Sequence, residues 1–194
     1  MLRAKAEAPA VARMLSDPDP GVREDAAGAL AGLGGPDQFD AVAALLKDPD
    51  PDVRSAVVHA CWNLGKEKSM KEVSGLLADP NHEVRQAALV TLGRPEGRES
   101  LPAVLEILAT DPEQKVRIVA MRAAGNVEDP SIAQRLIPYL EDEDSQMRQS
   151  AAMALVKLKP KEAVPALLSR LGDTEHPVRS MAIAALAAIG DVST

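Results

Sequence analysis

One short string of residues recurs six times along the chain, and this recurrence constrains the fold more than any other feature. The string begins with an aspartate, usually followed by proline, and carries an arginine six residues later, as in "DPDPDVRSA" from Asp48. A fixed period of about 31 residues indicates a stack of small units rather than one or two ordinary domains. The arginines, spaced 31, 31, 32, 31 and 31 residues apart, are Arg23, Arg54, Arg85, Arg117, Arg148 and Arg179.

Each unit predicts two helices joined by a tight turn. In the unit over residues 35–65, apolar residues at helical spacing predict the first helix. The second helix follows in "DPDPDVRSAVVHACWNLG", with Asp50 as N-cap, Pro51 at the first helical position and Gly65 as terminator. Pro49 disfavours helical geometry in the residue before it, so it marks the turn. A lone hairpin of this size cannot bury its apolar stripe, and stacked copies supply the missing core.

The composition supports close helix packing and disfavours several classes of function. The chain is 46% hydrophobic but has one Phe, one Trp and one Tyr, so the core must consist of aliphatic side chains, Ala and Met. A net charge of −7 argues against wholesale binding of nucleic acid or anionic membranes. Cys61 is the single cysteine, which excludes an internal disulfide, and we expect it in the core. The start of the chain has no apolar run typical of a signal or membrane segment, which predicts a cytoplasmic protein.

The recurring aspartates and arginines predict a ladder of ion pairs between neighbouring repeats. Each arginine falls on the turn side of its second helix, near the aspartates of the turns. Partly buried guanidinium–carboxylate pairs are directional, so such a ladder would set the angle between repeats. The alternative is that each aspartate caps its own helix while the arginine is solvated. The predicted ladder residues are Asp48, Arg54, Asp79, Arg85, Asp111, Arg117, Asp142 and Arg148.

The string "DPDPDVRSAVVHACWNLG", with its run of small and aliphatic residues and its late glycine, resembles the HEAT-like repeats of the phycobilisome-lyase type. The resemblance covers essentially the whole chain and implies an all-α solenoid of about six helical hairpins, a right-handed superhelix. It further implies that the second helices line a concave surface used to hold protein partners. We expect a single domain over residues 1–194, with repeats at approximately 1–34, 35–65, 66–95, 96–128, 129–159 and 160–191.

Two residues depart from the repeat pattern. Pro95 occupies a position that is aliphatic in the other units, so the second helix of repeat three should end near Gly93. Residues 94–98 should then form an irregular loop, at the point where the period lengthens to 32. Trp62 replaces a residue that is small or aliphatic elsewhere. We expect its ring to wedge into the junction with repeat three, the alternative being an exposed anchor.

A candidate groove lies along the second helices. Positions two, three, six and ten after the Val or Met of each string should face the groove, and in repeats three to five they combine apolar residues with cations. An apolar patch rimmed by polar groups is typical of a binding site, here for an apolar segment that carries acidic residues. The alternative is that Val90 and Val119 tuck between helices and the cations are solvated. The predicted groove residues are Val90, Arg94, Ile118, Val119, Arg122, Asn126, Met153 and Lys157.

The sequence predicts no catalytic residues, metal or cofactor. Its three histidines fall in different units, and the one His-Glu pair, His82-Glu83, differs from the several matched pairs of the HEAT-like deoxyhypusine hydroxylases. The related alkylpurine DNA glycosylases use aromatic residues and a basic groove, which this acidic chain does not offer. We therefore expect a non-enzymatic scaffold for a protein or peptide partner. The alternatives are a bilin lyase subunit or chromophore-handling factor, and an interaction module of a larger multidomain protein.

The last predicted helix is a poor end for a stack of repeats. The segment "VRSMAIAALAAIG" has no charged residue from Ser180 to Gly190. A terminal repeat needs a polar outer face, because it otherwise presents the apolar surface that inner repeats bury. We expect the face around Ile183, Leu186 and Ala187 to be covered by self-association or by further repeats of a longer parent protein. The alternative is that an alanine-rich helix tolerates exposure.

Overall fold

The computed structural model describes residues 2–33 and 35–190, and every regular element in them is helical, which confirms the predicted all-α repeat fold. Consecutive α-helices form six hairpins, from α1 with α2 to α11 with α12, as the repeat count predicts. The α-helices are α1 (Leu2–Arg13), α2 (Pro20–Leu33), α3 (Phe39–Ala43), α4 (Pro51–Gly65), α5 (Glu67–Ser74), α6 (His82–Leu92), α7 (Leu101–Thr110), α8 (Gln114–Asn126), α9 (Ala133–Leu136), α10 (Ser145–Leu158), α11 (Val164–Arg170) and α12 (His176–Gly190).

The α-helical part of the first helix is short in most hairpins, and tighter 3₁₀ turns continue the helix before or after it. In repeat two, for example, α3 is only five residues long, with 3₁₀ turns directly before and after it. The second helices of the hairpins are longer and, apart from α6 and α8, have 14 or 15 residues. The 3₁₀ segments are Met14–Ser16, Pro36–Gln38, Ala44–Lys47, Gly75–Ala78, Pro95–Ser100, Pro130–Ile132, Ile137–Glu141 and Lys161–Ala163.

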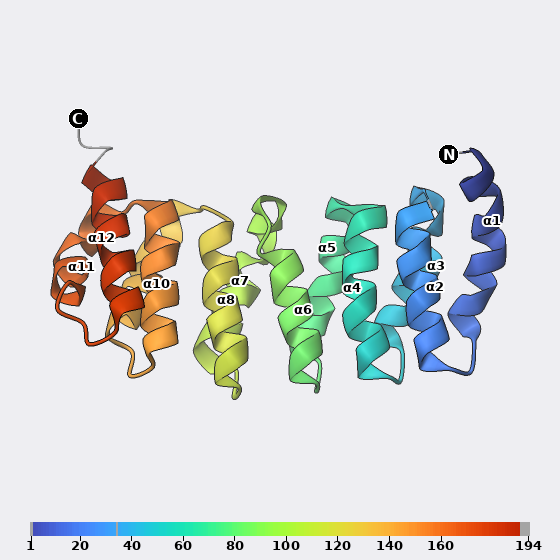
Figure 1. Ribbon diagram of the computed structural model, residues 1–194, viewed down its shortest axis with the longest axis horizontal. Helices are drawn as coiled ribbons and strands as arrows, with labels where there is room; N and C mark the ends of the chain where they lie inside the picture. The colour runs from blue at the N-terminus through green and yellow to red at the C-terminus, as the bar shows by residue number, and fades with distance from the viewer. Residues whose placement is uncertain (1, 34, 191–194) are drawn as a thin grey trace. The chain divides into compact units, whose positions relative to one another are not determined.

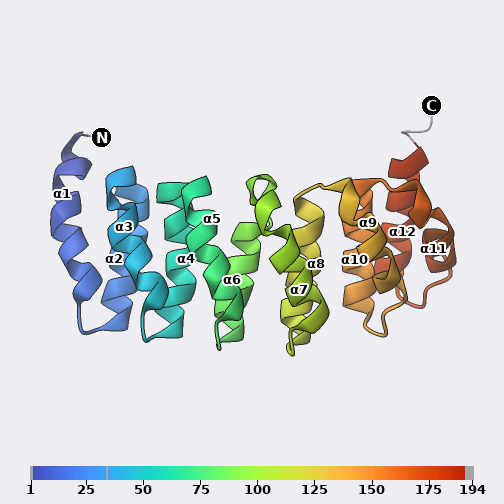
Figure 2. The ribbon, with the colours of Figure 1, turned by 180° about the vertical axis from the view of Figure 1, so that it is seen from behind.

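The chain forms two compact units, Met1–Leu92 and Gly93–Thr194. In unit 1, α2, α4 and α6 lie side by side as one layer, and α4 packs against both of the others (Figure 1). The first helices α3 and α5 form the other layer, which faces the viewer in Figure 2. The core between the layers is mainly aliphatic, as the composition predicts, although Phe39 and Trp62 are also buried in it, and its fully buried residues include Leu30, Val42, Val57 and Leu89.

Unit 2 repeats the same two-layer arrangement. Its second helices α8, α10 and α12 lie side by side, with α10 in the middle (Figure 1). The first helices α7 and α11 pack behind α8 and α12, respectively. Met121, Leu136, Met147, Leu155 and Leu167 are fully buried in this core.

The predicted start of the second helix is confirmed in repeat two, but its end differs from the prediction. The Asp50 carboxylate accepts a hydrogen bond from the Asp52 N–H at 2.8 Å, and α4 begins at Pro51. Gly65 is the last helical residue, and Lys66 takes the positive φ of 47° that ends the helix. The glycine serves packing instead, because a Cβ at Gly65 would collide with the ring of Phe39.

The structure confirms one part of the prediction for the junction after repeat three and corrects the other. Helix α6 ends at Leu92, which confirms the expected end near Gly93. Residues 94–98 are not an irregular loop, since Pro95–Ser100 forms a 3₁₀ helix. Proline has a fixed φ that suits the first turn of a helix, so Pro95 starts the 3₁₀ helix. It also prevents α6 from continuing past this point.

Candidate functional site

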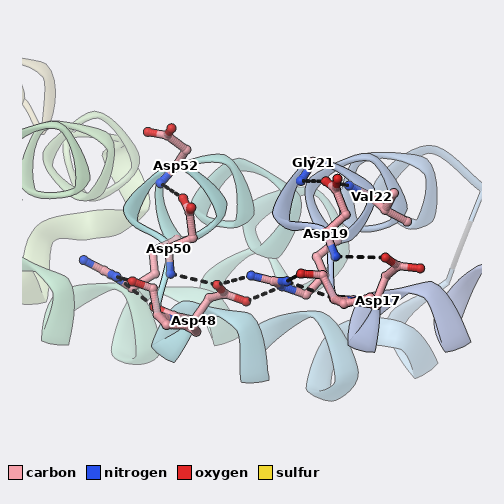
Figure 3. Close-up of polar contacts among 11 residues, drawn as sticks. Asp17, Asp19, Gly21, Val22, Asp48, Asp50 and Asp52 are labelled. Carbon is pink, nitrogen blue, oxygen red and sulfur yellow. Dashed lines mark hydrogen bonds and ion pairs between the residues drawn. The ribbon is translucent and has the colours of Figure 1, made fainter.

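The repeated string forms a joint in which one arginine connects two turns. In repeat one, Arg23 donates from Nη1 to the main-chain carbonyl of Asp17 in its own turn at 2.9 Å. The same guanidinium donates from Nε and Nη2 to both oxygens of Asp48 in the next turn, each at 2.8 Å (Figure 3). Asp48 also accepts the Asp50 N–H at 2.9 Å, which holds its own turn. Asp48 therefore orders its own turn, but Arg23 is paired and largely buried, so the alternative of a solvated arginine is wrong for this joint.

The same joint occurs twice more within the units. Arg54 pairs with Asp79 at 2.8 and 2.9 Å, and Arg148 pairs with Asp173 at 2.8 Å through both nitrogens. These aspartates are almost completely buried, and the arginine side chains are little more exposed. Hydrogen bonds from Arg148 hold the pKa of Asp173 below its ordinary value, against the opposing effect of burial. Each pair is bidentate and shielded, so it fixes both the distance and the angle between adjacent repeats.

Not every predicted ladder residue is joined in this way. Arg117 donates to the carbonyl of Asp111 in its own turn at 2.8 Å, but the described residues include no ion pair between Arg117 and Asp142. Asp142 is half-buried and accepts the Asp144 N–H at 2.9 Å. Arg85 makes the bond to its own turn that the other arginines make, since it donates to the Asp79 carbonyl at 2.9 Å. Asp111, its expected partner, belongs to the other unit.

The junction between repeats four and five has a different feature, a very close approach of α8 and α10. A Cβ added at Gly125 would lie 2.6 Å from the Cβ of Ala154 and 2.8 Å from its Cα. Two helices can come this close only where one of them has no side chain. Packing of small residues therefore holds the junction at which the Arg117–Asp142 pair is missing. The sequence analysis did not single out Gly125 or Ala154.

Four of the predicted groove residues come together on α8 and α10. Arg122 and Asn126 lie one turn apart on α8, and Met153 and Lys157 lie one turn apart on α10. With Gly125, Ser150 and Ala154 they line a hollow of about 20 Å³, which has room for one water molecule. Lys157 donates to the Asn126 side-chain oxygen at 2.9 Å, and Arg122 Nε donates to the Ser150 hydroxyl at 3.4 Å. We call Arg122, Asn126, Met153 and Lys157 the α8–α10 cluster.

The structure contradicts the predicted position of Ile118. We expected its side chain in the groove, but it is only 5% exposed. Ile118, Met121 and Gly125 follow one another at helical spacings of three and four residues, so they form one stripe along α8. Gly125 shows that this stripe faces α10, and Ile118 is buried on the same side. Position two of the string therefore contributes to the joint between repeats.

The other predicted groove residues lie apart from the cluster. Val119 is half-buried, as the alternative interpretation expects of a side chain tucked between helices. Val90 is 63% exposed on α6 and belongs to unit 1, which is inconsistent with the alternative that it is tucked away. Arg94 is half-buried at the beginning of unit 2. The site is therefore built here from α8 and α10 alone.

Trp62 and Cys61, which the sequence analysis also singled out, are both buried. Trp62 is buried, which excludes an exposed anchor, and the Lys66 ammonium lies 5.4 Å from the centre of its ring. Burial raises the pKa of the Cys61 thiol to about 12, with a smaller contribution from Glu72. Over residues 2–33 and 35–190 no three His, Cys, Asp or Glu residues gather as a metal site, and no described helix is long and apolar enough to cross a membrane.

Solved structures with the same architecture include natural and designed repeat proteins. A designed armadillo repeat protein in complex with the peptide (KR)4 has 21% identity and a TM-score of 0.67, over 94% of this chain and 99% of that chain. The complex of CpcE and CpcF of phycocyanin lyase from Nostoc sp. PCC7120 has 21% identity and a TM-score of 0.63, over 93% and 76% of the two chains. An engineered protein matches with a TM-score of 0.69 and 21% identity, over 95% and 99%. At this identity the likeness shows the fold alone.

The sequence itself shows the family. No curated protein matches the chain significantly. The family model of HEAT repeats, however, matches residues 40–125 and again residues 101–187. These two overlapping matches span the region from the second hairpin to the last and include every complete Asp–Arg joint except the first. The chain therefore belongs to the family of HEAT repeat proteins.

Proposed function

We propose that this protein is a non-enzymatic scaffold whose α8–α10 cluster binds an acidic, partly apolar segment of a protein partner. The observation that carries the proposal is the exposure of the two cations of the cluster and the neutral character of their hydrogen-bond partners. Arg122 and Lys157 are exposed and hydrogen-bond only to the neutral side chains of Ser150 and Asn126 among the described residues. Most joint arginines, by contrast, are satisfied by buried carboxylates or carbonyls. In a chain of net charge −7, two neighbouring cations to which no carboxylate of the described residues is bonded offer a site for a foreign anion.

The apolar part of the ligand would contact Met153. This side chain is half-buried and lines the hollow together with the two cations and the small residues Gly125 and Ala154. A flexible thioether adapts to differently shaped apolar groups, which suits a site for a peptide side chain. The hollow itself is too small for a cofactor-sized ligand, so recognition would rely on the surface of the helices.

The comparisons support this class of function. One solved relative in fold binds a peptide, and another is a complex of two protein chains. The alternative of a bilin lyase subunit rests on likeness of fold to the second of these, and a hollow of about 20 Å³ does not favour a tetrapyrrole at the cluster. A partner-binding scaffold needs no such cavity.

Fluorescence anisotropy with two labelled peptides tests the proposal. One peptide alternates Glu with Leu, and the other alternates Lys with Leu. We expect the acidic peptide to bind more tightly, and the double variant Arg122→Glu with Lys157→Glu to weaken its binding at least about tenfold, or about 1.4 kcal/mol.

The matched control reverses two exposed charges of the same unit outside the cluster, Lys115→Glu with Lys161→Glu. This control changes the net charge equally, so it should retain binding if the effect is local. Equal binding of both peptides, or equal loss in both variants, would show that the cluster is not the site.

A further inference from the structure

The two ends of the repeat array present matching halves of one joint. Inside each unit, position five after the Val or Met of the string is covered by the next repeat. Ala27 and Val58 in unit 1, and Met121 and Ala152 in unit 2, are at most 2% exposed. Ile183 occupies this position in α12, the last element that the structure describes, and it is 60% exposed. Its side chain therefore occupies the position that a following repeat would cover.

A second residue at this end shows the same contrast. The leucine two residues before the turn aspartate is buried in repeats one, two and five, as Leu15, Leu46 and Leu140. Its equivalent in repeat six, Leu171, is 40% exposed. We call the surface of Leu171 and Ile183, together with Ala187 from the same stripe of α12, the C-terminal face.

The other exposed surface of this kind belongs to repeat one. The first apolar residue of the string is at most 1% exposed where a preceding repeat lies in the same unit, as at Val53 and Val84, or at Met147 and Val178. Val22, at the same position in α2, is 37% exposed. A shallow hollow of about 250 Å³ opens beside it, and we call this surface the N-terminal face. Its lining residues are Val11, Met14, Val22, Asp25, Ala26 and Ala29.

The Asp–Arg ladder is open at the same two surfaces. Arg179 donates from Nη1 to the carbonyls of Asp173 and Thr174 at 2.6 and 2.8 Å, as in the other joints. No carboxylate meets this guanidinium among the described residues. The Asp17 carboxylate accepts the Asp19 N–H at 2.9 Å, as that of Asp48 accepts the Asp50 N–H, but in the described part of the chain no arginine donates to the Asp17 carboxylate (Figure 3). One end thus has the donor of a joint and the other end has the acceptor.

We propose that the C-terminal face of one copy of this chain docks on the N-terminal face of a second copy, in head-to-tail order. Arg179 would pair with Asp17 of the second copy, and Ile183 would enter the hollow beside Val22. The Arg179–Asp17 pair would reproduce the ion pair that joins repeats within the units, and its charges are complementary. Ile183 and Val22 occupy positions that are buried at the other repeats of the units. A head-to-tail contact joins unlike surfaces, so it generates rings or open chains rather than a closed twofold dimer.

Two variants that each block one face test the order of docking. Val22→Asp leaves the C-terminal face intact, and Ile183→Asp leaves the N-terminal face intact. We expect the unaltered chain to grow in mass with concentration by light scattering, and each variant alone to stay monomeric. An equimolar mixture of the two should form a dimer and nothing larger, because only one pair of faces remains. Both residues are exposed, so circular dichroism should show unchanged helicity.

The ion pair has its own test in the same assay. Asp17→Arg or Arg179→Asp alone should raise the dissociation constant at least about tenfold, and the two changes in one chain should restore association. Three results would overturn the proposal: an unaltered chain that is monomeric up to its solubility limit, a mixture that does not dimerise, or a Val22→Asp variant that dimerises alone. The last would indicate a twofold contact between two C-terminal faces.

Discussion

A single guanidinium performs two tasks in each complete joint. In repeat two, Nη1 of Arg54 bonds to carbonyls of its own turn, and Nε and Nη2 bond to Asp79 of the next turn. Lysine could not substitute for this arginine, because its ammonium has neither the planar fork nor the reach to serve two turns at once. The recurrence of arginine in the string therefore follows from the geometry of the joint.

Arg54→Ala should lower the free energy of unfolding by about 1–3 kcal/mol, because it leaves the buried Asp79 carboxylate without its charged partner. Arg117→Ala is the matched control, since Arg117 makes the same bonds to its own turn but has no carboxylate partner among the described residues. We expect it to cost clearly less. Urea denaturation measures both values, and an equal loss for the two variants would exclude the ion pair as the source of stability.

Between helices, joints are held in more than one way. The pair of α10 and α12 has the complete Arg148–Asp173 joint, whereas the pair of α8 and α10 has the close approach at Gly125. The same close approach brings the cations of the α8–α10 cluster together across the hollow. The glycine is therefore expected to affect both the stability of the joint and the geometry of the candidate site.

Gly125→Ala should destabilise the protein by about 1–3 kcal/mol, because the new Cβ would overlap Ala154 and the helices would have to move apart. The second change Ala154→Gly should restore only part of this loss, because the Cα of residue 154 is also too close. Thermal denaturation can rank the unaltered chain, the Gly125→Ala variant and the double variant. Gly28→Ala in α2 is the control, since a Cβ there meets nothing within 4 Å. Equal stability of both alanine variants would contradict the close approach.

For the whole molecule, the joints make stability depend on pH in the acid range. Hydrogen bonds from Arg23 lower the pKa of Asp48, and those from Arg148 lower the pKa of Asp173, in both cases against burial. Burial raises the pKa of Asp79, but the bonds from Arg54 and from the Asn81 N–H outweigh it, so its pKa is also lowered. These carboxylates therefore bind protons more weakly in the folded state than in the unfolded state.

We expect stability to be constant near neutral pH and to fall once the pH drops below about 4, the ordinary pKa of aspartate. The sign follows from the lowered pKa values, since the stabilising contribution is lost as the pH falls through them. Urea midpoints between neutral and acid pH measure this slope. The variant Asp173→Asn, which cannot ionise, should be less stable at neutral pH and should show a shallower acid decline. An unchanged slope would mean that other groups control acid unfolding.

The sequence by itself determined the architecture, because the fold is built from local patterns repeated at a fixed period. The helical spacing of apolar residues, the Asp50 cap and the prolines all act within one hairpin, and a hairpin with one apolar face must stack on copies of itself. The type of joint was also predictable, since Asp and Arg recur in every unit, but the predicted ladder left out Arg23 and Asp173, which complete two of the joints. Gly65 shows the limit even at this scale, because its role depends on the ring of Phe39, 26 residues earlier in the chain.

Only the tertiary structure decided which copies of the pattern behave alike. Arg54 and Arg117 occupy the same position of the string, yet among the described residues Arg54 pairs with a carboxylate and Arg117 does not, because the pairing depends on where the next turn lies. Ile118 was assigned to the groove from its position in one helix, but the nearness of α10 buries it. Val22 and Ile183 are ordinary core positions of the repeat, and they become surface because exposure is set by neighbouring repeats and not by the residue itself.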